Sequence, residues 1–441
     1  MDGSPKPASL AHNVKRLSHL DLPGAGQVYV EGDHAYIGHI PNSQQLGTTI
    51  LDVVDAKNPR IVSQIFIEDP DSHSHKARVI GDLMIINSER NMTAIGRKAD
   101  ELPKLRAQLK AELGRDPTHA ELAARLGVAI ADIPAVEEAE RKPYERGGFS
   151  LYDVSDKTKP KLISFQKTHG RGVHRFDMDA DYAYISTEMP GYIGNILVIY
   201  DIRNPAKPEE VSRWWMPGQH TGGGEKPHWP GRQHRLHHTL RVDNELWAGC
   251  WHGGVRVIDV SDIRKPQTVG AYNYHPPYPE PSHTFMPVLK KLDGKRIAVA
   301  IDEEDHAHDA EEMARRRGRP HGCLWILDVT DLEKIQPLSL FEVSELESPW
   351  SRTAPGRFGA HQFQEHWKGG DTLLYCTWFA GGLRIVDIAE PAAPQEVGWF
   401  IPEPVGGKPC PQTNDVDVDN RGLIYLADRY LGFDILEFKR P

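Results

Sequence analysis

Cysteine is scarce in this sequence. Among 441 residues there are four cysteines, and none forms a C-x-x-C pair: Cys250, Cys323, Cys376 and Cys410. Closely spaced cysteine pairs mark zinc ribbons and disulfide frameworks, so neither is expected. Isolated cysteines are usually buried and reduced in proteins of the cytosol. The cysteine content therefore predicts four buried thiols and a cytoplasmic location.

Long apolar and long basic segments are also missing. The first residues, MDGSPKPASLAHNVKRL, contain no apolar core of a secretory signal, and no apolar run approaches the roughly 18 residues of a membrane-spanning helix. The formal net charge is −10, from 52 basic and 62 acidic side chains. We therefore expect no membrane and no nucleic acid as partner, but a small-molecule substrate, and the oligomeric state stays open. Because no G-x-S-x-G elbow or phosphate-binding glycine loop occurs, nucleophilic catalysis is not indicated.

What the sequence does contain is a repeat. Two or three apolar residues, an acid and another apolar residue precede a turn rich in Asp, Lys and Pro. The copies are ILDVVDAKNP at 50–59, LYDVSDKTKP at 151–160, IYDIRNPAKP at 199–208, VIDVSDIRKP at 257–266, ILDVTDLEKI at 326–335 and IVDIAEPAAP at 385–394. A seventh copy, ILEF at 435–438, lacks the turn. Repeats of this length are typical of propellers and other arrays.

Each copy belongs to a longer unit of four expected strands. In the fourth unit these are HHTLRV, ELWAGCW, GGVRVIDV and QTVGAYNY, which are rich in β-branched and aromatic residues. Four antiparallel strands repeated about seven times predict an all-β fold, a seven-bladed β-propeller over residues 13–441. The last unit lacks an outer strand, and residues 13–22 resemble the outer strands of other units. We expect this N-terminal strand to complete the last blade and to protect its edge.

Residues 92–146 interrupt the repeat in the second unit. The segment is rich in Ala, Leu, Glu, Lys and Arg, with apolar residues at helical spacing such as Leu105, Leu109 and Leu113. It predicts two or three inserted helices that act as a lid or cap. Within it, GRDPTHAELAARLGV resembles a helical segment of bacterial sigma factors, but the acidic balance of the chain argues against DNA binding.

Five expected inner strands begin with histidine: His75, His174, His238, His283 and His361. In a propeller the first strand of every blade lines the central channel, and all first strands start at the same face. We therefore expect these imidazoles to converge on one small volume at one mouth of the channel. His234 and His237, in the loop before His238, can line the same mouth.

Glutamates or a further histidine follow three of these histidines at a fixed spacing. Glu89 follows His75 by fourteen residues, Glu188 follows His174 by fourteen, and His252 follows His238 by fourteen. The second strand of a blade returns to the same face, so these side chains should lie beside the histidines; Glu303 and Glu304 arrive there after a longer hairpin. Such groups orient ligating imidazoles or act as general bases. Glu89, Glu188 and His252 are therefore the predicted catalytic residues.

Converging imidazoles indicate a metal. Imidazole is a common ligand of zinc, copper, iron and nickel, and a bound cation relieves the repulsion among clustered histidines. The predicted metal ligands are His75, His174, His238, His283 and His361, with copper or iron favoured and manganese or zinc as alternatives. The competing interpretation is that the histidines bond to neighbouring backbone and cap a solvent-filled channel.

The repeated I-x-D-V/I-x-D…K-P segments resemble the LVIVD-repeat propeller family over nearly the whole chain outside the insertion. Residues 250–270, CWHGGVRVIDVSDIRKPQTVG, also resemble the selenium-binding protein and methanethiol oxidase family, which implies a propeller with copper-linked oxidation chemistry. The cysteine-rich N-terminal motif of that family has no counterpart in this chain. Of the five predicted ligands, His174, His238, His283 and His361 are the preferred ones, and this four-histidine geometry is similar to that of the carotenoid cleavage dioxygenases, which hold non-haem iron on seven blades. Such an analogy of fold does not assign chemistry.

Three functions follow as alternatives. The first is a metal-dependent oxidoreductase, an oxidase or oxygenase of a small organic molecule, because an imidazole set suits copper or iron. The second is a metal-dependent lyase or hydrolase in which manganese or zinc acts as a Lewis acid. Arg90, Arg171 and Arg235, expected at the mouth, would suit an anionic substrate of such an enzyme. The third is a non-catalytic interaction scaffold.

Overall fold

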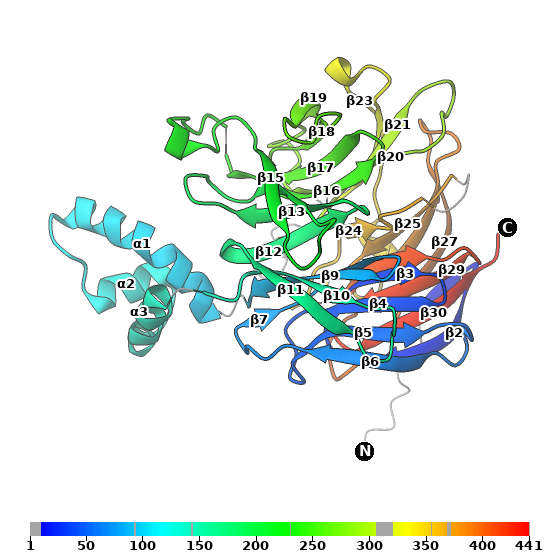
Figure 1. The fold of residues 1–441 in the computed structure, drawn as a ribbon, viewed down its shortest axis with the longest axis horizontal. Helices are drawn as coiled ribbons and strands as arrows, with labels where there is room; N and C mark the ends of the chain where they lie inside the picture. Colours follow the sequence, from blue (N-terminus) through cyan, green and yellow to red (C-terminus); the bar gives the residue numbers. More distant parts are fainter. Residues whose placement is uncertain are drawn as a thin grey trace.

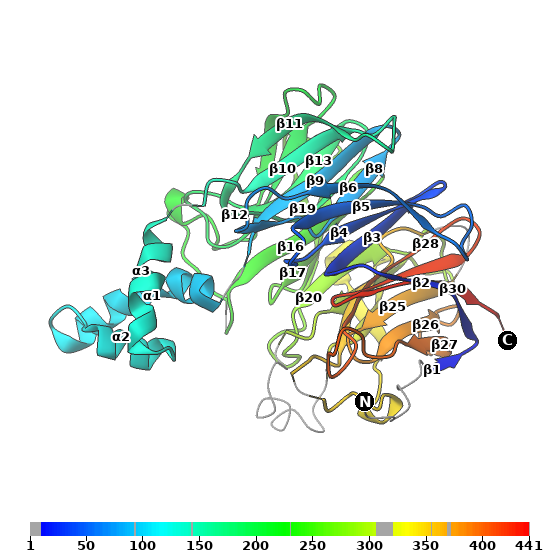
Figure 2. The ribbon, with the colours of Figure 1, turned by 90° about the horizontal axis from the view of Figure 1, so that it is seen from below.

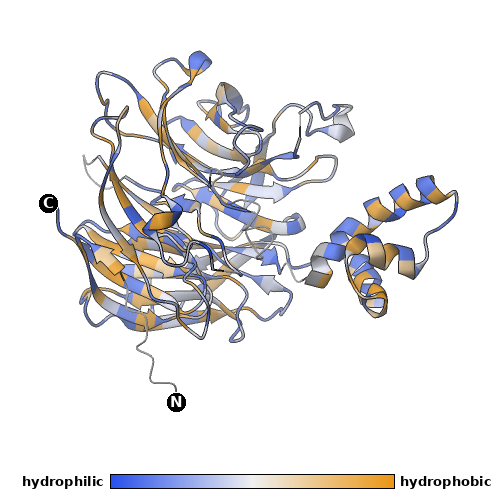
Figure 3. Ribbon diagram, turned by 180° about the vertical axis from the view of Figure 1, so that it is seen from behind, coloured by the Kyte–Doolittle hydropathy of each residue, from blue (hydrophilic) through white to orange (hydrophobic). Residues whose placement is uncertain are grey.

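The computed structural model describes residues 10–91, 94–142, 144–229, 231–305, 321–353, 355–367 and 372–440. β-Strands dominate these residues and are arranged side by side around the centre of the molecule (Figure 1), and the strand pairs within each run are antiparallel. Figure 3 shows that the strands carry most of the hydrophobic segments, whereas the turns are largely hydrophilic. The chain is therefore an all-β protein apart from one helical segment.

Runs of four antiparallel strands make up the sheets in the first half of the chain. The first run is β3 (Ala25–Glu31), β4 (His34–His39), β5 (Leu46–Asp52) and β6 (Arg60–Phe66). The next is β8 (Ala77–Ile80), β9 (Leu83–Arg90), β10 (Gly148–Asp153) and β11 (Lys161–Lys167), with β7 (Ser72–His73) also paired to β9. It is followed by β12 (His169–Met178), β13 (Tyr182–Glu188), β14 (Ile196–Asp201) and β15 (Glu209–Trp214).

The same arrangement continues through the second half. Its runs are β16 (His234–Val242), β17 (Glu245–Trp251), β18 (Val255–Asp259) and β19 (Gln267–Tyr272); β20 (Ser282–Pro287), β21 (Ile297–Asp302), β22 (Leu324–Asp328) and β23 (Gln336–Phe341); and β24 (Ala360–Phe363), β25 (Leu373–Trp378), β26 (Gly382–Asp387) and β27 (Gln395–Ile401). Single residue pairs connect neighbouring runs, Glu89 with Gly172 and Trp251 with Ser282.

The last sheet joins the two ends of the chain. It consists of β28 (Thr413–Val418), β29 (Leu423–Asp428), β30 (Gly432–Phe438) and, as its outer strand, the N-terminal β2 (Val14–Asp21). Figure 2 shows β2 and β30 side by side. The short β1 (Leu10–His12) pairs with β27 instead, so it extends the preceding sheet.

The acid of the sequence repeat ends the third strand of each run. Its carboxylate accepts a hydrogen bond of 2.8–3.0 Å from the backbone N–H two residues later, at Asp52, Asp153, Asp201, Asp259, Asp328 and Asp387. This is the local bond by which Asp stabilises a turn. The repeated acid is therefore part of the turn and does not reach the centre of the molecule. The polar side chains at the centre come from the inner strands.

Burial separates the inner from the outer strands. Every residue of β20 and of β28 is buried, whereas β6 and β11 are half-exposed along most of their length. Apolar side chains of neighbouring runs pack into shared clusters, for example Val416 of β28 with Ile385 of β26. The inner strands therefore lie at the centre of the molecule, where their polar side chains meet.

Helices α1 (Ala94–Leu113), α2 (His119–Leu126) and α3 (Ile133–Arg141) lie between β9 and β10 and extend outward from the sheets (Figures 1 and 2). They have a hydrophobic core of their own, which includes Leu102, Leu109, Leu122 and Val136. A capping box between Thr118 and Glu121 begins α2. Short 3₁₀ turns occur at Ile130–Asp132, Thr221–Gly223, Leu332–Lys334 and Glu345–Glu347. No helix in the described part of the chain is long and apolar enough to cross a membrane.

Candidate metal centre

An arc of five imidazoles lies at the centre of the sheets. The ring centres are separated by 5.3 Å between His75 and His174, 4.9 Å between His174 and His237, 3.8 Å between His237 and His283, and 4.5 Å between His283 and His361. Apart from His75, which follows β7, each belongs to an inner strand: β12, β16, β20 and β24. The arrangement of the inner strands thus brings together side chains that are far apart in the sequence.

In two of these histidines, His174 and His237, the Nε2 atoms face each other. The Nδ1–H of His174 donates to the Glu89 carboxylate, 2.9 Å from Oε2, and that of His237 donates to the backbone oxygen of His283 at 2.9 Å. In the neutral form each of these rings carries one proton, and these partners then hold it on Nδ1 and leave the lone pair on Nε2. The two Nε2 atoms lie 3.1 Å apart.

That separation suits a shared metal ion. Lone pairs facing each other at 3.1 Å repel unless a proton or a cation lies between them. Two nitrogens bound at roughly 2.0–2.1 Å to one tetrahedral ion lie about 3.3–3.4 Å apart, close to the spacing found here. Histidines that bind metals normally donate their other N–H to a carboxylate or a backbone carbonyl, as His174 and His237 do.

His283 and His361 follow the same pattern. The Thr284 hydroxyl donates to Gln362, so it accepts from His283 Nδ1 at 2.8 Å. The Nδ1–H of His361 donates to the backbone oxygen of Asn414. Both histidines therefore also carry a lone pair on Nε2.

The carboxylate of Glu303 lies between His283 and His361. Its oxygens are 3.8 Å from the Nε2 atom of each ring, and Arg357 donates to it at 2.7 Å. Burial alone would raise the pKa of Glu303, but His361 and Arg357 outweigh it and hold the pKa well below its usual value. One donor atom from each of His237, His283 and Glu303 lies within 4.8 Å of the other two. An ionised carboxylate thus faces the same space as the imidazoles.

Burial keeps three of the imidazoles neutral. It lowers the pKa of His237, His283 and His361 well below the usual value, and the neighbouring histidines and arginines lower it further. Only the neutral imidazole binds a metal. These three residues are therefore in the ligating form at neutral pH.

His75 and His238 have different partners. The amide of Asn87 donates to Nδ1 of His75 at 3.1 Å, which leaves the proton on Nε2. Nε2 of His238 lies 3.1 Å from the Glu365 carboxylate, and its Nδ1 lies 2.9 Å from Nδ1 of His237. The lone pair of His238 therefore points at His237. His75 thus ends the arc and His238 lies beside it, and neither directs an unprotonated nitrogen into the space shared by His174 and His237.

The three predicted catalytic residues occupy different surroundings. Glu89 lies inside the arc, between His174 and His73, whose Nε2 is 3.4 Å away. Glu188 accepts from the backbone N–H of Arg171 at 3.0 Å. His252 is 3.2 Å from the backbone oxygen of Pro279. Of the three, Glu89 is the residue that contacts a candidate ligand.

A buried arginine adjoins the centre. The Arg175 guanidinium donates to Nε2 of His283 at 3.2 Å, and 3% of the residue is exposed. A metal ion bound to that nitrogen would take the place of this hydrogen bond, so Arg175 would have to move. His174 and His237 therefore form the better-prepared half of the centre.

Comparisons with known proteins agree with this fold. The LVIVD repeat model matches residues 179–214 and 373–401. The WD40 β-propeller domain of Doa1 superposes with a TM-score of 0.52 at 6% identity, over 97% of this chain and 97% of that one. The chain has a β-propeller fold, and two of its segments match the LVIVD repeat. A protein from Lactobacillus plantarum is also similar to the propeller, with a TM-score of 0.53 at 11% identity, over 90% of this chain and 88% of that one. No curated protein sequence matches this chain.

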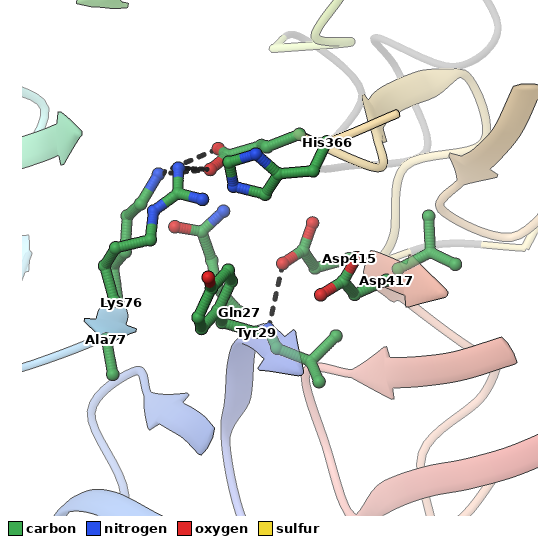
Figure 4. A pocket seen from close by; sticks show the side chains of 11 residues that line it. Gln27, Tyr29, Lys76, Ala77, His366, Asp415 and Asp417 are labelled. Carbon is green, nitrogen blue, oxygen red and sulfur yellow. Dashed lines mark hydrogen bonds and ion pairs between the residues drawn. The ribbon is translucent and has the colours of Figure 1, made fainter. Parts of the chain in front are cut away.

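The propeller also has a polar pocket beside the arc (Figure 4). Lys76, Arg78 and Glu365 form ion pairs on one side of it, 2.6 and 2.9 Å long, and Asp415 and Gln27 lie on the other. Its free volume, about 10 Å³, is enough for one water molecule at most. This pocket is therefore too small for a substrate, and it supports His238 through Glu365.

Sequence analysis placed His237 at the channel mouth but not among the metal ligands, because of a local irregularity. The register between β16 and β17 shifts between His234 and His238, so one residue before the expected strand start faces the arc. The tandem histidines of QHRLHH were the available signal. Arg175 gave no signal, because a single arginine in a strand has many ordinary roles.

Proposed function

We propose that this protein is a metal-dependent oxidoreductase, an oxidase or oxygenase of a small organic molecule. The observation that carries the proposal is the pair of Nε2 atoms of His174 and His237, 3.1 Å apart, with each Nδ1–H held by an acceptor. His283, His361 and Glu303 extend the ligand set. Glu89 orients His174, and Arg357 holds Glu303.

The donors favour iron or copper. Imidazole suits iron, copper and zinc, and two histidines with one carboxylate are the ligand set of non-haem Fe(II) oxygenases. His237, His283 and Glu303 match that composition. When bound, such an ion would supply the electron transfer that none of these side chains provides. Manganese and zinc are the alternatives.

The finer features of the fold belong to this proposal. The four-stranded runs would be the blades of a seven-bladed propeller, with β2 completing the last blade and residues 92–146 as an insertion in the second that acts as a lid or cap. The local resemblance of residues 250–270 to the selenium-binding protein and methanethiol oxidase family stays a prediction, in the same class of chemistry.

Metal analysis tests the centre. We expect near-stoichiometric iron or copper in protein purified without chelator. His174→Ala and His237→Ala should lose most of it, whereas His39→Gln, at a buried histidine outside the arc, should keep it. Protein that carries no metal, or a His237→Ala variant that retains it fully, would contradict the proposal.

Oxygen use tests the reaction class. We expect the anaerobically reduced protein to consume oxygen when air is admitted, at a rate that falls in His237→Ala. A redox-silent metal without oxygen uptake would favour the second candidate, a lyase or hydrolase in which manganese or zinc is a Lewis acid. Buried Glu89 and Glu303 beside the arc would then serve as bases. Folded protein without metal would favour an interaction scaffold.

A further inference from the structure

Arg235 lies two residues before His237 in β16, with Leu236 between them. The register of β16 against β17 is irregular from His234 to His238, so contacts and not strand alternation show where these side chains lie. Leu236, 1% exposed, packs in a hydrophobic cluster with Trp214 and Leu246, whereas Arg235 and His237 both adjoin the ring of Trp251.

The guanidinium of Arg235 lies over an aromatic ring next to the centre. Its carbon is 3.8 Å from the ring centre of Trp251, and that ring is 6.0 Å from the ring of His237. Burial lowers the pKa of Arg235, followed in effect by the charge of Arg171, while the charge of Asp305 and then those of Glu89 and Glu303 act in the opposite direction. An arginine stays protonated under such shifts. A fixed positive charge thus stands near both carboxylates of the arc.

Among the described residues, Arg235 differs from Arg171 and Arg357 in having no carboxylate at ion-pair distance; Asp305 acts on it only at longer range. Arg171 pairs with Asp100 of α1 at 2.9 Å, and Arg357 pairs with Glu303 at 2.7 Å. Within the described ranges, no carboxylate lies within 4.0 Å of the Arg235 guanidinium. A half-buried charge without a partner is costly, and a guanidinium over an aromatic ring can still offer N–H groups to a planar anion.

We propose that Arg235 binds the carboxylate of the substrate, which is a small organic acid anion; this rests on the function proposed above. One unpaired guanidinium matches the single negative charge of a carboxylate. Trp251 supports the guanidinium, and the anion bound there lies beside His237. Arg235 is thus a substrate-binding residue and does not ligate the metal.

Calorimetric titration with benzoate and with uncharged benzamide tests this site. We expect wild-type protein to bind benzoate at least tenfold more tightly than benzamide. Arg235→Gln should weaken benzoate binding at least tenfold and leave benzamide binding unchanged. Arg235→Lys, which keeps the charge, should retain part of the affinity. Arg60→Gln, at an arginine paired with Asp52 on the surface, is the matched control and should bind as wild type.

Equal binding of benzoate and benzamide, or unchanged benzoate binding by Arg235→Gln, would overturn the inference. So would inorganic phosphate binding that needs Arg235 while benzoate fails to bind. Each titration is run on chelator-treated and on metal-loaded protein, with metal content and thermal unfolding measured. Arg235-dependent benzoate binding in protein that never binds metal would uphold the anion site and reject the oxidoreductase.

Discussion

Glu89 reaches the centre through another side chain. Its carboxylate accepts the Nδ1–H of His174 at 2.9 Å and lies 3.4 Å from Nε2 of His73. Burial would raise the pKa of Glu89, but His174 and His73 lower it well below the usual value, so it is ionised. Its role in the proposed centre is to fix the proton of His174 on Nδ1.

Glu89→Gln should weaken the binding of metal by about 10–100-fold, as is usual for groups that orient a ligand. A glutamine fills the same space but has no negative charge. Competition with a chelator of known affinity measures the change. Glu188→Gln is the matched control, because Glu188 bonds to the backbone of Arg171; equal losses in the two variants would contradict the role of Glu89.

His39 gives a pH test away from the centre. It is fully buried, its Nδ1–H donates to the Pro23 oxygen at 2.8 Å, and burial lowers its pKa to about 4. The unfolded chain binds the proton near pH 6.5, so the stability due to neutral His39 is lost as the pH falls from 6.5 toward 4. Between pH 7 and pH 5 the wild type should lose about 2 kcal/mol more unfolding free energy than His39→Gln.

Urea unfolding of both proteins at the two pH values measures this difference. The comparison cancels the titration of all other groups, whose surroundings the substitution leaves in place. A difference that does not change with pH would show that His39 titrates normally in the folded protein.

At the residue scale, sequence analysis found the kinds of side chain better than their orientations. It placed His174, His283 and His361 at the starts of inner strands, where the structure brings them together. It could not separate His237 from His238, because a register shift of one residue exchanges the faces of a strand. Nor could it assign the tautomer of His75, which depends on Asn87, a residue of another strand.

Among the elements, β2 is joined to the last sheet by ion pairs of Arg16 as well as by backbone hydrogen bonds. Arg16 lies 2.7 Å from Glu403 and 2.8 Å from Asp434, which is buried. Arg16→Gln should lower the free energy of unfolding by about 1–3 kcal/mol, because a buried carboxylate loses its charged partner. Arg60→Gln removes an exposed ion pair and should cost at most about 1 kcal/mol. Equal effects in denaturant unfolding would contradict this view of β2.

The helices α1–α3 should be dispensable for the sheets. They have their own hydrophobic core, and β9 pairs directly with β10 through Ser88 and Gly148. Replacing residues 94–142 by a short Gly/Ser linker should shift the Tm of the sheets by less than about 2 °C, equivalent to about 1–2 kcal/mol, because it removes mainly surface ion pairs of Asp100. Differential scanning calorimetry measures this, and a large loss would show that the helices support the sheets.

The elements themselves differ in how well sequence predicts them. Strands that precede the Asp turns are evident, because alternating apolar residues and a turn signal coincide, as at Asp259. β1 was not predicted, since the three residues Leu10–His12 carry no pattern and pair with β27 only by proximity. Short edge strands depend on tertiary contact rather than on local sequence.

For the whole molecule, the predictions of an all-β fold, a β-propeller and LVIVD repeats are confirmed. Such a fold can be recognised from sequence because each copy repeats the same pattern. The cluster of charged side chains around the centre could not be predicted in this way. The chain has a net charge of −10, yet Arg175, Arg235, Arg357 and Arg429 gather around the arc. Only the fold determines which charges come together.

The sheet that unites β2 with β28–β30 also sets the order in which the protein can be completed. On the ribosome, the residues of β2 emerge more than 400 positions ahead of those of β30, with which they pair. Early folding cannot give this strand its native neighbour before β30 has been synthesised. Closure of the last sheet consequently comes after the other sheets have all been synthesised.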